Sequence, residues 1–247
     1  TAFFSSENLD WGHMVNYLDT GSVDHLMHAA NWGGPTYVNP TDTGFSSWVS
    51  RTKAAGSIDD RYTIDEAVKW VDQGGENAPF FIYFNLQSTH FPYRVPGNAP
   101  RRFSKHKPDF MMTYGYFQRD RLAEIRDLYD DSAYYIDLQL GRFFDHLRQR
   151  GLWDNTIIVF SGDHGEAFLE HNFATHAGPL YNEVMKVPLV IRIPGMKPAR
   201  HDRLAQHIDA TPTVLHALGL PPHPAHQGID LIATEPSSTR TIYMVAQ

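Results

Sequence analysis

The amino-acid sequence predicts an α/β fold in which a mostly parallel β-sheet is covered by helices on both faces. Three continuous apolar runs have the length and composition of buried strands, at 80–86, 156–160 and 187–193. Three amphipathic helical patterns accompany them, at about 59–75, 121–150 and 209–218. Buried strands that alternate with amphipathic helices are typical of a parallel sheet between two helical layers.

Cap residues mark the ends of the predicted helices. Asp59 precedes the first helix, and the pair Gly74-Gly75 ends it. Gly151 ends the long second helix, because glycine readily adopts the backbone conformation that closes a helix. Asp209 is expected to be the N-cap of the last helix, with a structural role, and Gly219 closes that helix.

The remaining segments have weaker patterns. Residues 1–60 predict loops and short helices after a short strand at 1–6, because they are rich in Gly, Ser, Asn and Asp. Residues 95–120 contain three prolines and predict a long surface loop that shapes a binding cleft. Residues 232–247 form a C-terminal extension with a possible last strand at 242–246.

Composition excludes several classes of protein. The 247 residues are 42% hydrophobic and 20% charged, which is typical of a globular domain. A formal net charge of −7 and the lack of a long basic run argue against nucleic acid as a partner. No apolar stretch approaches the ~20 residues of a membrane span. Because cysteine is absent, neither a disulfide nor a thiolate metal ligand can form.

The turn Gly162-Asp163-His164-Gly165 follows the strand-like run 156–160 directly. It therefore places a carboxylate and an imidazole at the carboxyl end of a buried strand, where open α/β sheets bind their ligands. Carboxylate oxygens and imidazole nitrogens are common ligands of divalent cations. We expect Asp163 and His164 to bind a metal.

Two further histidines are candidate catalytic residues. His90 lies just beyond the run 80–86, in the same position relative to its strand as Asp163. An imidazole at that place can protonate a leaving oxygen or donate a hydrogen bond to an ester oxygen. His176 follows His164 by twelve residues, and a returning loop could bring it back over the metal turn. His171 competes with His176 for this role.

Several stretches resemble the sulfatase branch of the alkaline phosphatase superfamily in order and spacing. The best-matched part spans residues 60–231 within a partial catalytic domain that covers 1–247. The matching stretches are 80–92, 137–156, 160–166, 176–189, 209–213, 218–220 and 228–231.

This resemblance implies roles for the candidate residues. Asp163 and His164 would be ligands of a divalent cation, with calcium expected and zinc, manganese or magnesium as alternatives. His90 and His176 would contact the sulfate or phosphate group of an anionic ester substrate. The implied activity is the hydrolysis of sulfate esters.

One part of the family pattern is missing. Sulfatases open with a strand that ends in paired Asp ligands, followed by a Cys- or Ser-x-Pro-x-Arg motif that supplies the nucleophile. The chain has no cysteine and no Ser-x-Pro-x-Arg motif. We therefore expect a C-terminal portion that is inactive by itself, with the nucleophile upstream of Thr1. A signal there would indicate a periplasmic, extracellular or membrane-tethered protein; the sequence leaves the oligomeric state open.

Two alternatives remain at this point. One is a phosphoethanolamine or glycerol-phosphate transferase, or a phosphodiesterase, of the same superfamily. The other is a non-catalytic module that binds an anionic lipid or glycan. The presence of Asp163, His164, His90 and His176 together favours an enzyme over the module.

Overall fold

A computed structural model gives the arrangement of most of the chain. The described residues are 1–10, 13–18, 20–36, 56–75, 79–105, 109–110, 112–176, 178–234 and 240–242. Three strands form a parallel sheet in the order β2-β1-β3: β1 (Ala2–Ser5), β2 (His25–Met27) and β3 (Ile82–Asn85). The predicted strands near 1–6 and 80–86 are thereby confirmed. β2 was not predicted, because three residues are too few to show a periodic pattern.

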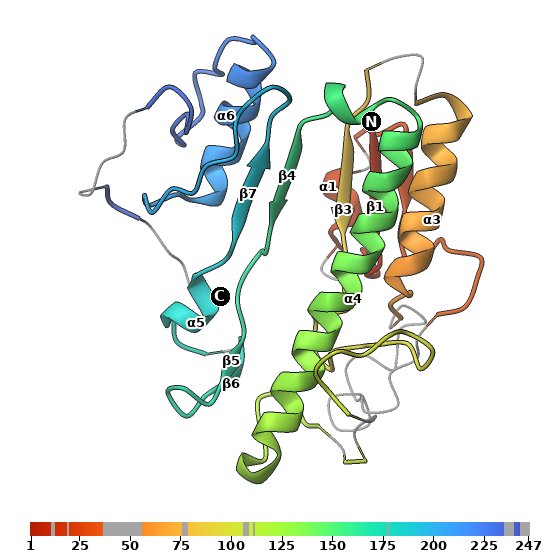
Figure 1. Cartoon of the computed structure of the whole chain (residues 1–247), viewed down its shortest axis with the longest axis vertical. Coiled ribbons are helices and arrows are strands. Elements are labelled where there is room, and N and C mark those ends of the chain that lie inside the picture. Colours follow the sequence, from red (N-terminus) through yellow and green to blue (C-terminus); the bar gives the residue numbers. More distant parts are fainter. Residues whose placement is uncertain are drawn as a thin grey trace.

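Four other strands form two antiparallel pairs (Figure 1). β4 (Ile158–Ser161) pairs with β7 (Leu189–Arg192), and β5 (Ala167–Phe168) pairs with β6 (Ala174–Thr175). The parallel sheet with its helices confirms the α/β fold class, although β4 and β7 run antiparallel to each other. The possible strand at 242–246 falls mostly on residues 243–247, which lie outside the described residues.

All three predicted helices are present. They are α3 (Asp60–Trp70), which continues into a π-helical turn η2 (Val71–Gly75), α4 (Leu122–Gln149) and α6 (Ala210–Ala217). The short helices are α1 (Val15–Leu18), η3 (Arg119–Arg121), η4 (Trp153–Asn155), α5 (Asn182–Met185) and η5 (His207–Asp209). Among the described helices, none has the length and apolar character needed to cross a bilayer.

Helices α3 and α4 pack against each other and against one face of the parallel sheet. Ala2 and Phe4 of β1 point into this layer, where Ile64 of α3 and Phe143 of α4 are also buried. These alternate β1 residues share one face because side chains along a strand point to opposite sides. The burial of this layer fixes the position of β3 and hence of the turn that follows it.

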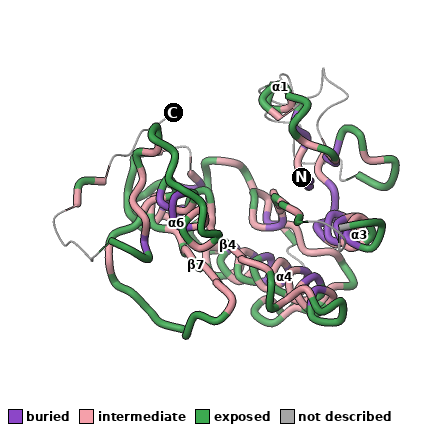
Figure 2. Tube along the Cα trace, turned by 90° about the horizontal axis from the view of Figure 1, so that it is seen from above, coloured by how far each residue is buried: buried purple, intermediate pink, exposed green. Residues whose placement is uncertain are grey.

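The strands are more open than the sequence suggested. Buried residues gather on α3 and α4, whereas β4 and β7 consist of intermediate and exposed residues (Figure 2). Tyr83 in β3 is 49% exposed and stacks on Phe3, and Val190 in β7 is 57% exposed. The expectation that the run 80–86 is a fully buried strand is therefore wrong for one side of β3, and the strand in the run 187–193 is also exposed at Val190. For β3 the physical reason is that, among the described elements, α3 and α4 cover only the Phe4 side of the parallel sheet.

A second apolar cluster attaches the segment 95–118 to α4. Phe117 is buried in this cluster against Ile125 of α4 and Phe168 of β5. In the described part of this segment, the one strand-like pairing is an isolated bridge between Thr113 and Tyr116. The long segment therefore lies over the end of the domain that carries the β5–β6 hairpin.

A buried carboxylate on α4 also holds this segment. Asp131 is fully buried and accepts hydrogen bonds from the backbone N–H groups of Arg102 (2.7 Å), Phe103 (2.9 Å) and Ser104 (3.0 Å). Burial alone would raise the pKa of Asp131, but the Ser104 hydroxyl and the three backbone donors outweigh burial, and the net pKa is lowered.

Asp209 performs a similar task near the C-terminus. It stands at the N-cap of α6, but its carboxylate makes no cap hydrogen bond to that helix. Instead it accepts from the N–H groups of Gln206 (2.7 Å) and Ile229 (2.9 Å) and pairs with the Arg240 guanidinium. The structural role expected for Asp209 is confirmed. Its capping contact, however, belongs to a capping box with Gln206 at η5 and not to α6, and its other contacts join two distant segments.

Replacing Asp131 with asparagine should lower the free energy of unfolding by about 3 kcal/mol, because an amide turns one acceptor into a donor facing buried N–H groups. The folded pKa of Asp131 is lowered, so its contribution is present above the unfolded pKa of about 3.9 and is lost as the pH falls through the folded pKa. Urea denaturation at several pH values measures both effects.

Asp137→Asn is the matched control, since Asp137 is exposed on the same helix. It should change the free energy of unfolding by less than about 0.5 kcal/mol. Equal effects of the two substitutions, or an Asp131→Asn effect that persists undiminished below the folded pKa, would contradict the role assigned to Asp131.

Gly165→Ala should destabilise the fold by about 2 kcal/mol through overpacking. A Cβ at Gly165 would lie 2.1 Å from the backbone oxygen of Glu183, so the turn after β4 would have to move away from α5. Gly141→Ala, in the middle of α4, meets no atom within 4 Å and should instead stabilise by up to about 1 kcal/mol. Urea midpoints of both variants test this contrast.

Candidate active site

The turn after β4 presents Asp163 and His164 to solvent. The Asp163 side chain is 87% exposed, and its Oδ1 accepts the backbone N–H of His164 at 2.9 Å. His164 Nδ1 lies 2.8 Å from the carbonyl oxygen of Gly165. Because a carbonyl can only accept, Nδ1 carries the hydrogen and Nε2 is left free to bind a cation. This Nε2 lies 3.7 Å from Asp163 Oδ2, so both donors face the same region.

Two neighbouring segments hold this turn in place. The Gly165 N–H donates to the carbonyl of Val184 in α5 at 2.6 Å. On the other side, His207 Nε2 lies 2.8 Å from the carbonyl of Gly162. The position of the two candidate ligands therefore depends on α5 and on the segment before α6, as well as on β4.

His176 lies directly against the metal turn. Its ring centroid is 4.0 Å from that of His164 and 5.9 Å from that of His90. The three imidazoles come from different segments, one after β3, one after β4 and one after β6. The structure thus brings together residues that the sequence singled out separately, and their catalytic roles remain predictions.

His90 is fixed by its own turn. Its backbone N–H donates to the carbonyl of Gln87 at 3.0 Å, and its Nδ1 lies 2.9 Å from the carbonyl of Phe91. Part of the ring stays exposed, but the surrounding protein lowers the pKa of His90, with the nearby charge of His176 as the second cause. The Nδ1 contact leaves Nε2 of His90 available to a ligand.

Two residues that the sequence analysis did not single out contact His176. Glu166 Oε1 lies 3.2 Å from His176 Nδ1, and the Tyr114 hydroxyl lies 3.1 Å from His176 Nε2. Glu166 closes the Gly162–Glu166 motif, so its place in the sequence was a signal that could have been used. Tyr114 stands 62 residues from His176, in a segment without periodic pattern, and no sequence signal marks it.

The structure separates His171 from this group. Its Nδ1 pairs with Glu183 at 2.6 Å, and its ring stacks on Tyr181 with centroids 3.8 Å apart. Of the two histidines that competed for one role, His176 is therefore the one that lies beside His164.

The fit of a divalent cation can be judged from the donors present. Asp163 and His164 offer one carboxylate and one imidazole nitrogen on the same side of the turn. Among the described residues, no group of three or more His, Cys, Asp or Glu side chains is arranged to hold a metal ion. Since calcium takes about six to eight oxygen ligands, these two residues account for only part of a coordination shell.

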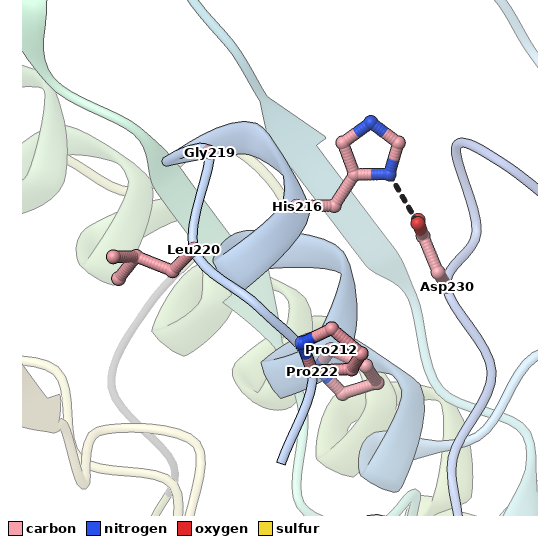
Figure 3. A pocket seen from close by; sticks show the side chains of 6 residues that line it. All are labelled: Pro212, His216, Gly219, Leu220, Pro222 and Asp230. Atoms are coloured by element: carbon pink, nitrogen blue, oxygen red, sulfur yellow. Dashed lines mark hydrogen bonds and ion pairs between the residues drawn. The ribbon is translucent and has the colours of Figure 1, made fainter.

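A hollow of about 310 Å³ lies next to α6 (Figure 3). Its mostly apolar wall includes Pro212, Leu220 and Pro222, and the ion pair between His216 and Asp230 stands at its side. His216 is in the last turn of α6, whereas His207, which contacts the metal turn, precedes the first turn. This hollow is separate from the cluster of three histidines.

Comparison with curated proteins finds relatives that are about one-third identical to this chain over the aligned residues. An endo-4-O-sulfatase of Bacteroides thetaiotaomicron is 30% identical over 148 residues, 58% of this chain and 29% of the relative. The multifunctional alkaline phosphatase superfamily protein PehA of Trinickia caryophylli is 35% identical over 163 residues, which cover 58% of this chain and 31% of PehA. Lipoteichoic acid synthase 2 of Bacillus subtilis is 31% identical over 150 residues, which cover 58% of this chain and 21% of the synthase.

Solved structures share the fold over nearly the whole chain. A phosphonate monoester hydrolase of Agrobacterium radiobacter superposes with a TM-score of 0.63 at 20% identity, covering 97% of this chain and 60% of the hydrolase. An alkaline phosphatase superfamily protein of Vibrio parahaemolyticus gives a TM-score of 0.63 at 19% identity, covering 94% of this chain and 47% of the Vibrio protein. This chain therefore spans about half the length of these structures.

The family-level match is more extensive than these alignments with single curated relatives. The profile of the sulfatase family matches residues 1–220, which include β3 and β4, the strands that precede His90 and Asp163, and all four predicted site residues. The chain belongs to the sulfatase family.

Proposed function

We propose that this chain forms part of a metal-dependent hydrolase of sulfate esters. The observation that supports this most is the convergence of His90, His164 and His176, beside Asp163, from three separate segments of the fold. A cluster of imidazoles and a carboxylate can bind a cation and an oxyanion together, which is what the hydrolysis of an anionic ester requires.

Each residue has a proposed task. Asp163 Oδ2 and His164 Nε2 would hold the divalent cation, which we expect to be calcium, with zinc, manganese or magnesium as alternatives because imidazole accepts softer metals. When bound, such a cation neutralises negative charge on the ester. His90 and His176 would contact the ester oxygens, either by donating hydrogen bonds or by protonating the leaving oxygen.

Activity would require the part of the family fold that these 247 residues do not span. The chain has neither a cysteine nor a Ser-x-Pro-x-Arg motif to supply a nucleophile. Among the described strands, β3 and β4 are each paired along one edge only, and Tyr83 and Val159 beside these edges are exposed. Further chain could add to the sheet there, and it would have to carry the nucleophile and the other metal ligands.

The second candidate is phosphoryl chemistry at the same site, by a transferase or a phosphodiesterase. It is favoured by two of the relatives, which are named as a lipoteichoic acid synthase and as a multifunctional alkaline phosphatase superfamily protein. Sulfate and phosphate esters have similar shape and charge, so the histidine cluster by itself suits both. A non-catalytic anion-binding module is the third candidate.

Turnover assays of the full-length protein with an aryl sulfate and an aryl phosphate diester, together with metal analysis by mass spectrometry, separate these candidates. We expect bound divalent metal and faster hydrolysis of the sulfate. Preference for the phosphate diester would support the second candidate instead. An absence of both metal and turnover would leave the binding module and overturn the two enzyme proposals.

Single substitutions test the roles within the site. Asp163→Ala should strip the metal, because it removes one of two adjacent ligands, and mass spectrometry reads this loss directly. His176→Ala should lower kcat by about 100-fold or more, the usual contribution of a positioned proton donor. His171→Ala is the matched control and should stay within about threefold, because surface changes outside a site have small effects. Equal losses in the two histidine variants would contradict the assignment of His176.

A further inference from the structure

We propose that Glu166 is a positioning residue that fixes the orientation of the His176 ring. This inference rests on the proposed function, in which His176 contacts the ester, and adds to it a residue that would not itself touch substrate. It is carried by the contacts of Glu166, by its burial and by its place opposite His176 in the β5–β6 hairpin.

The contact between the two side chains determines which nitrogen faces the site. Glu166 Oε1 lies 3.2 Å from His176 Nδ1, and an ionised carboxylate can only accept hydrogen bonds. The shared hydrogen therefore sits on Nδ1, which leaves Nε2 as the nitrogen that faces the site. Nε2 donates to an ester oxygen when the ring carries its second proton. Nε2 lies 3.1 Å from the Tyr114 hydroxyl, which can either donate or accept and so tolerates both states of that nitrogen.

The backbone places Glu166 and His176 directly across from each other. In the antiparallel pair β5–β6, Ala167 lies opposite Thr175 and Phe168 lies opposite Ala174. One step further out, the register brings Glu166 opposite His176, where facing side chains are close neighbours. A short hairpin thus fixes both ends of the contact, and Gly165 anchors the hairpin to α5 through its bond to Val184.

Because the Glu166 carboxylate is buried, it needs a hydrogen-bond donor from the protein. The Glu166 side chain is only 5% exposed, and its neighbourhood is aromatic, with Tyr93 and Phe168 buried nearby. Burial, and then the charge of Glu166, raise the pKa of Tyr93, so that phenol stays neutral beside the carboxylate. A carboxylate in such surroundings is costly unless a donor meets it, and hydrogen bonds strengthen there. His176 Nδ1, at 3.2 Å from Oε1, is a donor placed to meet it, beside the nearby Tyr93 hydroxyl.

The chain contains a second Glu–His pair for comparison. Glu183 accepts from His171 Nδ1 at 2.6 Å, but the His171 side chain is 50% exposed, against 21% for His176. The two pairs have the same chemistry and lie close in sequence, and only one adjoins the histidine cluster. Glu183→Ala is therefore the matched control for Glu166→Ala.

The test compares Glu166→Ala, Glu166→Gln and Glu183→Ala in the full-length protein. Glutamine keeps an oxygen that can accept from Nδ1, so Glu166→Gln should stay within about threefold of the parent kcat. Glu166→Ala should lower kcat about 10- to 100-fold, the usual cost of losing a supporting partner, with KM changed less than about threefold. Glu183→Ala should stay within about threefold in both constants.

A second readout does not depend on turnover. In protein labelled with 15N-histidine, the Nδ1–H signal of His176, assigned with His176→Ala, should persist in Glu166→Gln and broaden or shift in Glu166→Ala. An unchanged signal in Glu166→Ala would overturn the positioning role even if the enzyme is active. A changed signal in a protein that hydrolyses neither ester would support the positioning role and overturn the proposed function.

Discussion

The buried carboxylate of Asp60 is the interaction on which the candidate site most depends. It stands at the start of α3 and accepts hydrogen bonds from the N–H groups of Gln87 and Ser88, both at 2.9 Å, and from the Ser88 hydroxyl. Burial raises the pKa of Asp60, because a charge without water is costly, and these donors offset part of that cost. They tie α3 to the turn after β3, and the same turn carries the backbone hydrogen bond that fixes His90. The packing of α3 thereby helps to fix the position of His90.

Asp131 and Asp209 repeat this arrangement elsewhere in the molecule. Each is fully buried, and each accepts backbone hydrogen bonds from a segment distant in sequence. A buried charged acceptor fixes the path of such a segment through hydrogen bonds, and for residues 95–118 these add to the apolar contacts of Phe117. Asp209 holds Gln206, which is next to His207, and Asp131 holds residues 102–104 of the segment that also contains Tyr114. His207 and Tyr114 both contact the candidate site.

The candidate site therefore combines the family fold with side-chain contacts between segments that lie far apart in the sequence. Asp163 and His164 follow the end of β4, and many α/β proteins bind ligands at such strand ends. The fold that places this strand end is the one shared by the sulfatase family. The ring of His176, in contrast, is held by Glu166 on one side and Tyr114 on the other. Contacts of this kind can differ between relatives while the fold stays the same, and they are where substrate preference can be set.

The sequence alone determined the fold class, the three main helices and the family, because these depend on periodic patterns and motifs that are local in the chain. It also marked Asp163, His164, His90 and His176, since each lies at a strand end or within a motif. Only the tertiary structure decided between His176 and His171, because both have the same local signal and differ in which segment they pack against. The contacts of Glu166 and Tyr114, the antiparallel pairing of β4 with β7, and the open face at Tyr83 were likewise decided by contacts between distant segments, which no local pattern encodes.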